Sequence, residues 1–79
     1  MEITVKYYGM LSEITGQSVE TFTFAENISV GKLREGILNR YPDMMSKKFK
    51  VAVNLQISDD DVCIGAGSEI ALLPPFAGG

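Results

Sequence analysis

Two N-terminal stretches of the chain show the pattern of β-strands. Apolar and polar side chains alternate over residues 2–8, which is the period of a half-buried strand. The apolar positions are Ile3, Val5 and Tyr7. Residues 19–24 are rich in β-branched and aromatic side chains, with Phe22 and Phe24 on one face. Because few residues separate the two strands, we expect them to pair antiparallel.

The middle of the chain, over residues 30–41, has the pattern of an amphipathic helix. Its apolar residues recur three and four positions apart. They are Val30, Leu33, Ile37, Leu38 and Tyr41. Ser29 is placed to cap the helix, and Pro42 ends it because the residue before a proline is driven out of the helical region. Gly36 costs a helix about 1 kcal/mol relative to alanine, so we expect it to mark close packing against a sheet.

Three further elements complete the pattern. A short apolar stretch over residues 10–14, ended by Gly16, predicts one or two helical turns. The segments FKVAVNL (49–55) and GSEIALL (67–73) predict two more strands. This order predicts an α+β fold, with a mixed sheet of about four to five strands and one main helix packed on one face. It is a β-grasp, or ubiquitin-like, arrangement, in which the last strand lies centrally.

Length and charge limit the possible functions. A chain of 79 residues allows one domain, which we assign to residues 1–75, with a flexible C-terminal Gly-Gly tail over 76–79. The net charge of −3 argues against nucleic-acid binding, which needs a concentrated basic face. The one basic cluster, at residues 47–50, is interpreted as a solvated loop edge or as a contact for an acidic partner. No apolar run approaches the ~20 residues of a membrane span and no signal peptide is recognisable, so we expect a cytoplasmic protein without a membrane partner.

The folded body offers no set of residues for catalysis. The chain has no histidine, which excludes histidine-based triads and zinc sites. Its one cysteine, Cys63, lies between apolar residues and is interpreted as a small buried hydrophobe. The adjacent carboxylates at 59–61 would alternate in direction, so they do not converge as calcium ligands do, and we interpret them as a solvated turn. We therefore expect no bound metal or cofactor.

The C-terminal sequence ALLPPFAGG carries the functional prediction. Pro74 and Pro75 favour an extended path. Gly78 and Gly79 have no side chains, so this end can thread a narrow channel in another protein. Its one functional group is the α-carboxylate of Gly79, which is a poor acyl donor until it is joined to AMP as a mixed anhydride. The activated carbonyl is then open to attack by sulfur or nitrogen.

Four segments carry a resemblance to a known family. They are VKYYGMLSEITG (5–16), VAVN (51–54), SEIALLPP (68–75) and PPFAGG (74–79). Over essentially its whole length, the chain resembles the small, sulfur-carrier subunit of molybdopterin synthase (MoaD-type; MoaD/ThiS family). A proline pair four residues before the terminal Gly-Gly is similar to the molybdopterin branch of that family.

The resemblance implies a role for the terminal glycines. Gly79 is expected to be adenylated by an ATP-using, E1-like enzyme and converted to a thiocarboxylate, while Gly78 keeps the tail thin. The tail would then enter the large synthase subunit, whose residues transfer the sulfur to a cyclic pterin phosphate. The chain is thus expected to donate sulfur within a heterotetramer of two small and two large subunits, with the catalytic residues in its partner. ATP serves the activating enzyme, and a separate system donates the sulfur.

The expected partner interface surrounds the tail. Tyr8 alternates away from the buried side of the first strand, so we expect its ring to be exposed near the tail's exit. The interface residues are expected to be Tyr8, Pro74, Pro75, Phe76 and Ala77. Three positions depart from the family pattern: Phe76 stands for a usual valine, Ser12 for an arginine and Gly9 for an alanine.

Three other functions share these features. The first is a sulfur carrier for thiamine synthesis or another pathway. The second is a ubiquitin-like modifier that acylates lysines, and the third is a β-grasp interaction module whose tail has no function. The mass of the mature C-terminus separates these classes, because a carrier gains sulfur there and a modifier becomes linked to a lysine.

Overall fold

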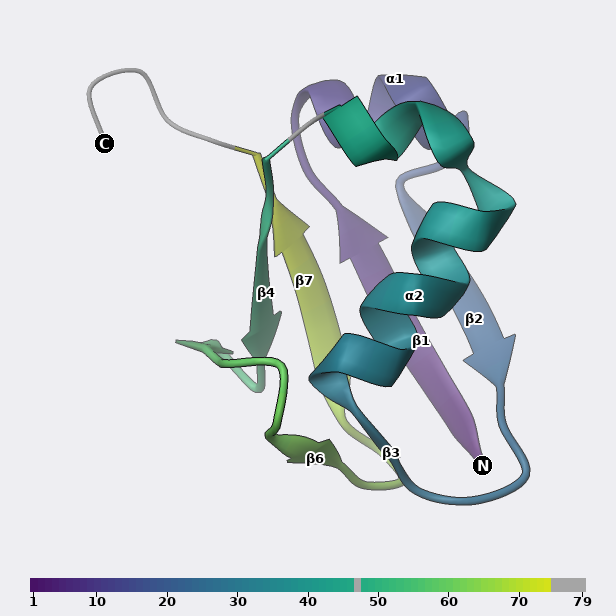
Figure 1. The fold of residues 1–79 in the computed structure, drawn as a ribbon, viewed down its shortest axis with the longest axis vertical. Helices are drawn as coiled ribbons and strands as arrows, with labels where there is room; N and C mark the ends of the chain where they lie inside the picture. Colours follow the sequence, from purple (N-terminus) through teal and green to yellow (C-terminus); the bar gives the residue numbers. More distant parts are fainter. Residues whose placement is uncertain (47, 75–79) are drawn as a thin grey trace.

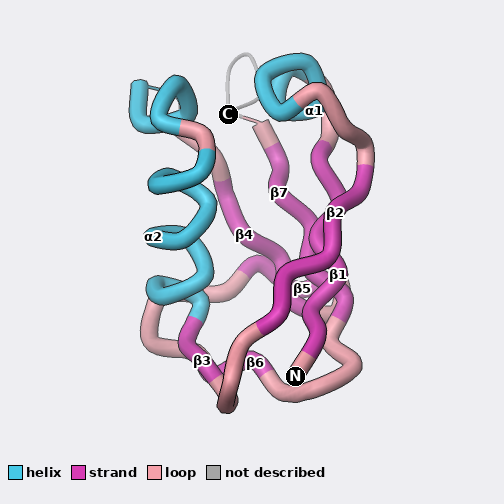
Figure 2. The backbone as a smooth tube through the Cα atoms, turned by 90° about the vertical axis from the view of Figure 1, so that its right-hand side faces the viewer, coloured by secondary structure: helices cyan, strands magenta, loops and turns pink. Residues whose placement is uncertain are grey.

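A computed structural model of the chain describes residues 1–46 and 48–74 (Figure 1). The strands are β1 (Glu2–Tyr7), β2 (Val19–Thr23), β3 (Ile28–Ser29), β4 (Lys50–Val53), β5 (Gln56–Ile57), β6 (Cys63–Ile64) and β7 (Glu69–Leu73). The helices are α1 (Met10–Thr15), α2 (Val30–Arg40) and the 3₁₀ helix η1 (Pro42–Ser46). Helix α2 lies along one face of the main sheet, and α1 lies at the end of the sheet where β7 stops (Figures 1 and 2).

The main sheet has the order β2-β1-β7-β4-β5. Strand β1 pairs antiparallel with β2 and parallel with β7, and β7 pairs antiparallel with β4. The predicted α+β, β-grasp architecture is confirmed, as are the antiparallel pairing of the first two strands and the central place of the last one. Strands β3 and β6 form a separate two-stranded sheet. Strands β3, β5 and β6 are each two residues long, which is too short to show a period in the sequence.

The core lies between the sheet and the helices. The predicted inward positions of β1 are all buried, and so are Ile70 and Leu72 of β7 and most of the predicted apolar positions of α2. The fully buried side chains are Ile3, Val5, Leu11, Val30, Leu33, Ile37, Met44, Val51, Ile64, Ile70 and Leu72. Within residues 1–46 and 48–74, no helix is both long and apolar enough to cross a membrane.

The N-terminus of α2 is capped twice. The predicted cap is confirmed, because the Ser29 hydroxyl accepts a hydrogen bond from the Lys32 amide at 3.1 Å. A loop that follows β5 supplies further acceptors, including the Asp60 carbonyl, which receives the Gly31 amide at 2.9 Å. The helix ends at Arg40, as the proline signal predicts. Both caps satisfy amides that have no partner inside the helix.

Two predictions from the sequence are wrong. A Cβ atom placed on Gly36 would meet nothing within 4 Å, so this glycine does not mark close packing. The close approach is at Gly31, where a Cβ would lie 3.2 Å from the Asp60 carbonyl oxygen. Cys63 is exposed and not buried. It lies in the short strand β6, where the alternation points Ile64 into the core and turns the thiol outward.

Candidate functional site

The candidate site begins where β7 ends. Pro75, Phe76, Ala77, Gly78 and Gly79, on which most of the functional prediction rests, lie outside the described residues. The boundary that we set between a domain over 1–75 and a tail over 76–79 therefore stays a prediction. The structure instead describes the surface from which this segment starts.

Strand β7, which leads into the tail, is hydrogen-bonded to β1 on one edge and to β4 on the other. Leu72 is paired with Tyr7 of β1, and Leu73 is paired with Lys50 of β4. Beyond the end of β1, the Tyr8 amide still donates to the Leu72 carbonyl at 3.3 Å. A central strand bonded on both edges is the part of a sheet that frays least. The residue that follows it, Pro74, therefore starts from a fixed position.

Two exposed apolar side chains flank Gly9 in the chain, and the Pro74 ring lies against Gly9. Tyr8 is 46% exposed, which confirms the outward position predicted from the alternation in β1. Met10, two residues later, is 42% exposed, and Pro74 is half-buried. We call Tyr8, Met10 and Pro74 the exit surface. Ser12 makes a local bond, donating its hydroxyl to the Gly9 carbonyl at 2.8 Å.

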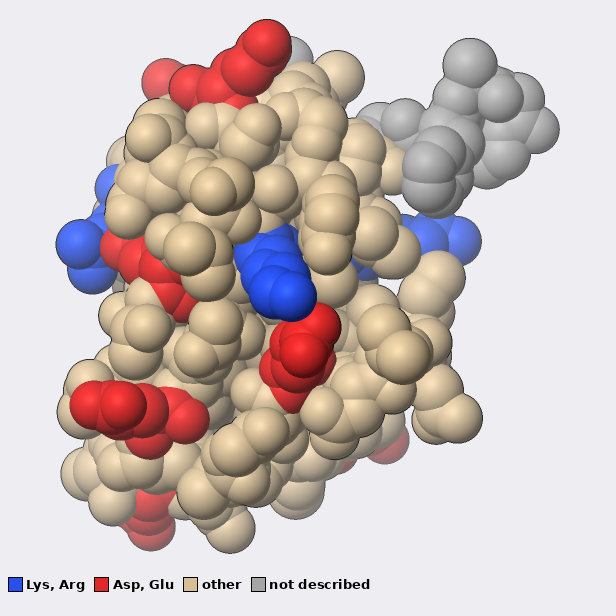
Figure 3. All heavy atoms as spheres, turned by 180° about the vertical axis from the view of Figure 1, so that it is seen from behind, with Lys and Arg blue, Asp and Glu red and all other residues tan. Residues whose placement is uncertain are grey.

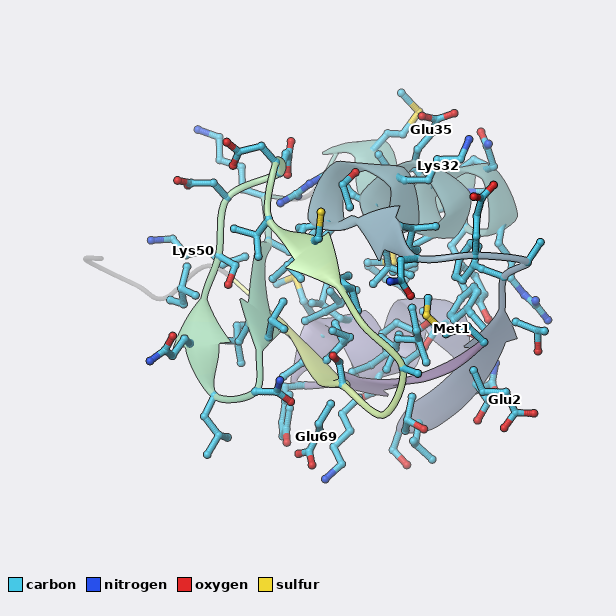
Figure 4. All side chains as sticks on the ribbon, turned by 90° about the horizontal axis from the view of Figure 1, so that it is seen from below. Met1, Glu2, Lys32, Glu35, Lys50 and Glu69 are labelled. Atoms are coloured by element: carbon cyan, nitrogen blue, oxygen red, sulfur yellow. The ribbon has the colours of Figure 1, made fainter. Side chains whose placement is uncertain are left out.

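The sheet face opposite α2 is open and carries both charged and uncharged groups (Figure 3). Glu69 points away from α2, on the far side of the sheet from Lys32 and Glu35 (Figure 4). The Lys6 ammonium pairs with Glu69 at 3.2 Å, and Figure 3 shows basic and acidic groups in contact near the middle of this face, surrounded mostly by uncharged atoms. Ala71 and Leu73 alternate to the same side of β7. The open face thus adds uncharged surface next to the exit surface.

The structure brings together a polar network that the sequence did not predict. The Glu20 side chain, only 6% exposed, accepts hydrogen bonds from the hydroxyls of Tyr7 at 2.7 Å and Tyr41 at 2.8 Å. Its other oxygen lies 3.0 Å from Nε of Arg40. Gln17 donates to the Tyr41 hydroxyl at 2.9 Å. The network ties β1 and β2 to the C-terminal end of α2.

Hydrogen bonding decides the charge of this network. Burial of the Glu20 carboxylate raises its pKa, but the bonds from the two tyrosines and the nearby guanidinium of Arg40 outweigh burial and hold the pKa below its ordinary value. Burial, and then the bond to Glu20, raise the pKa of Tyr7. Tyr7 and Tyr41 therefore stay protonated donors to an ionised carboxylate. This is a structural network and not a general base, since its acceptor is already saturated.

The other charged groups that could form a binding site make only local contacts. Arg34, beside an open groove, pairs with Asp60 at 3.1 Å and lies over the Phe49 ring at 4.8 Å. The carboxylates at 59–61 are exposed, as predicted for a solvated turn. Among the described residues, no three histidine, cysteine or acidic side chains are grouped closely enough to hold a metal ion.

The basic cluster is partly described. Lys48 and Lys50 are exposed, and the structure shows no ion pair between either of them and another described residue. Lys47 lies outside the described residues. The two lysines fit the predicted solvated edge.

The fold is similar to that of several solved proteins. A putative molybdopterin converting factor subunit 1 from Pyrococcus furiosus superposes with a TM-score of 0.89 at 21% identity, over 96% of this chain and 99% of the other. SAMP1 from Haloferax volcanii gives a TM-score of 0.85 at 21% identity, over the whole of both chains. A chain in the complex of subunits 1 and 2 of molybdopterin-converting factor from Helicobacter pylori gives 0.70 at 23% identity, also over both whole chains. At these identities the likeness shows the β-grasp fold.

Sequence comparison is more specific. The human molybdopterin synthase sulfur carrier subunit is 29% identical, over 99% of this chain and 94% of the human protein. The Caenorhabditis elegans protein of the same name is 28% identical, over 100% of this chain and 99% of the relative. The ThiS family model matches residues 5–79, which include the terminal glycines. Because that match covers nearly the whole chain, the chain belongs to the ThiS family.

Proposed function

We propose that this chain is the sulfur carrier subunit of a molybdopterin synthase. The observation that carries the proposal is the alignment of proteins with that name along the whole chain, within a family match that runs to Gly79. The described residues support it by what they offer, which is a strand end bonded on both edges with exposed apolar side chains beside it.

The carrier chemistry takes place at Gly79. Its carboxylate attacks the α-phosphorus of ATP and releases pyrophosphate, which gives an acyl adenylate. A sulfur nucleophile from a donor system then displaces AMP and leaves a terminal thiocarboxylate. In the large subunit, the thiocarboxylate sulfur forms a bond to a carbon of a cyclic pterin phosphate while a C–O bond at that carbon breaks, and the oxygen leaves on the phosphate or as water. Water then cleaves the resulting thioester, which returns the Gly79 carboxylate and leaves the sulfur on the pterin. Two such cycles supply both sulfurs of the dithiolene.

Partners follow from this chemistry. The H. pylori complex of subunits 1 and 2 supports a large subunit as partner. For this chain we propose that Tyr8, Pro74, Pro75, Phe76 and Ala77 contact that subunit, while Gly78 lies in its channel. The assembly has two small and two large subunits, and an E1-like enzyme uses ATP to activate the tail. The chain itself holds no cofactor, binds neither nucleic acid nor membrane, and works in the cytoplasm.

Intact-mass spectrometry tests the proposal. The purified chain is incubated with its activating enzyme, ATP and sulfide, and the expected product carries sulfur in place of one oxygen at Gly79. The thiocarboxylated chain, added to the large subunit and the pterin substrate, should return to the carboxylate form. A chain that keeps its carboxylate, or that becomes linked through Gly79 to lysines, contradicts the carrier role. Discharge only by a thiamine-pathway acceptor would assign the other pathway.

A further inference from the structure

Gly9, between β1 and α1, has a backbone conformation that favours glycine. Its φ of 57° and ψ of −134° match the first central position of a turn that mirrors type II. The turn is closed by a hydrogen bond from the Leu11 amide to the Tyr8 carbonyl at 3.1 Å. The Gly9 carbonyl accepts from both the amide and the hydroxyl of Ser12, at 3.1 and 2.8 Å. Gly9 is thus held in place on both sides.

The bare Cα of Gly9 lies against the ring of Pro74. A Cβ atom added at Gly9 would be 3.1 Å from Cγ of Pro74 and 3.9 Å from its Cβ. Separations of this kind leave no room for a methyl group unless the ring shifts by a few tenths of an ångström. Figure 2 shows the same arrangement at the level of the backbone, with the start of α1 beside the end of β7.

We propose that Gly9 is a positioning residue for the C-terminal tail. The missing side chain forms a seat for the Pro74 ring and so sets the direction in which the chain continues from β7. The consequence for sulfur transfer rests on the function proposed above; the seat itself does not.

A shift of the Pro74 ring changes the position from which the tail starts. Five residues follow Pro74, and at about 3.4 Å per residue they reach roughly 17 Å when extended. When the tail is held extended in the partner's channel, as the proposed function requires, a displaced starting point changes where Gly79 meets the reacting atoms. A misplacement of about 1 Å can cost a reaction about a hundredfold. A shift of a few tenths of an ångström should therefore slow transfer about three- to tenfold.

Gly9→Ala and Gly16→Ala form a matched pair for the test. Gly16 ends the same helix with φ 75°, so alanine is strained there too, but its Cβ would meet nothing within 4 Å. Gly9→Ala should lower the urea midpoint more than Gly16→Ala, because alanine adopts the left-handed conformation of Gly16 at lower cost than the φ 57°, ψ −134° of Gly9. Only Gly9→Ala should slow single-turnover sulfur transfer from the thiocarboxylated chain to the large subunit at saturating concentration. Equal transfer rates for the two variants would overturn the proposal.

A double-mutant cycle with Pro74→Ala, which removes the ring from the other side of the contact, adds a second readout. Pro74→Ala should slow transfer, and Gly9→Ala should then cause no further loss in that background, whereas multiplying effects would contradict a shared seat. The seat is also visible without sulfur chemistry, as a nuclear Overhauser contact between the Gly9 α-protons and the Pro74 ring in the free wild-type protein. If this contact is absent, the inference fails whatever the function. If it is present but wild-type Gly79 never gains sulfur, the proposed function fails and the seat stands.

Discussion

Replacing Glu20 with glutamine should destabilise the fold although it changes no apolar contact. The carboxylate accepts hydrogen bonds from Tyr7 and Tyr41 and pairs with Arg40. A hydrogen bond to a charged group contributes about 1.5–3 kcal/mol, against about 0.5–1.5 kcal/mol for a neutral pair. The amide therefore loses about 1 kcal/mol at each of the two hydroxyls. Arg40 is 58% exposed, so its pair adds at most about 1 kcal/mol.

We therefore expect Glu20→Gln to lower the free energy of unfolding by about 2–3 kcal/mol, out of the about 5–15 kcal/mol typical of a domain. The loss should depend on pH. The pKa of Glu20 is lower in the folded protein than its ordinary value of 4.5, so the unfolded chain takes up this proton more readily. The network stabilises the fold fully above the unfolded pKa, and that stabilisation disappears as the pH falls through the folded pKa.

Urea denaturation at a series of pH values, followed by circular dichroism, measures both effects. Glu26→Gln is the matched control, because Glu26 is exposed and the substitution removes the same charge. The difference between Glu20→Gln and wild type should be large at neutral pH and shrink below about pH 4.5. If Glu20→Gln stays within about 0.5 kcal/mol of the control at neutral pH, or if the difference does not shrink in acid, the network does not stabilise the fold as argued.

Three substitutions and one deletion test other parts of the chain. Gly31→Ala places a Cβ 3.2 Å from Asp60 and should cost about 1–3 kcal/mol of stability in urea denaturation, whereas Gly36→Ala in the same helix meets nothing and should stabilise it by up to about 1 kcal/mol. Cys63→Ala, at an exposed position, should change stability by less than about 0.5 kcal/mol and leave sulfur transfer intact; a loss of transfer with the fold preserved would place the carrier atom on the thiol. Deleting Gly79 should abolish thiocarboxylate formation by intact mass without changing the urea midpoint, and a chain that still gained sulfur would contradict the proposed function.

The regular elements could be predicted because each has a period long enough to read. The alternation in β1 identified both its buried side and the exposed ring of Tyr8, and the cap at Ser29 located the start of α2. The two-residue strands could not be predicted, since they are defined by their partners. Gly31 and Gly36 look alike in the sequence. Only the loop that packs beside α2 leaves no room for a side chain at Gly31, whereas Gly36 has open space around it.

The sequence contains one indication of the Glu20 network, which is the position of Glu20 in the alternation of the second strand. The alternation in residues 19–24 puts Phe22 and Phe24 on one face of the second strand, and it puts Glu20 on the same face. A carboxylate on an inward face needs hydrogen-bond donors, since burying it without them is costly. The alternation in the first strand puts Tyr7 on its inward face, so the Tyr7 hydroxyl is a donor that the sequence indicates for Glu20. Tyr41 and Arg40 reach Glu20 only because α2 packs beside the two strands.

The terminal glycines cannot by themselves decide which partner the tail serves. Gly78 and Gly79 have no side chains, so every channel narrow enough for them accepts them about equally. Specificity is a difference between affinities, and that difference must come from groups with side chains. On the proposed function those groups are the exit surface of Tyr8, Met10 and Pro74 together with the open face of the sheet. A sulfur carrier that serves first an activating enzyme and then a synthase therefore keeps its reactive end uniform and its partner choice in the folded body beside it.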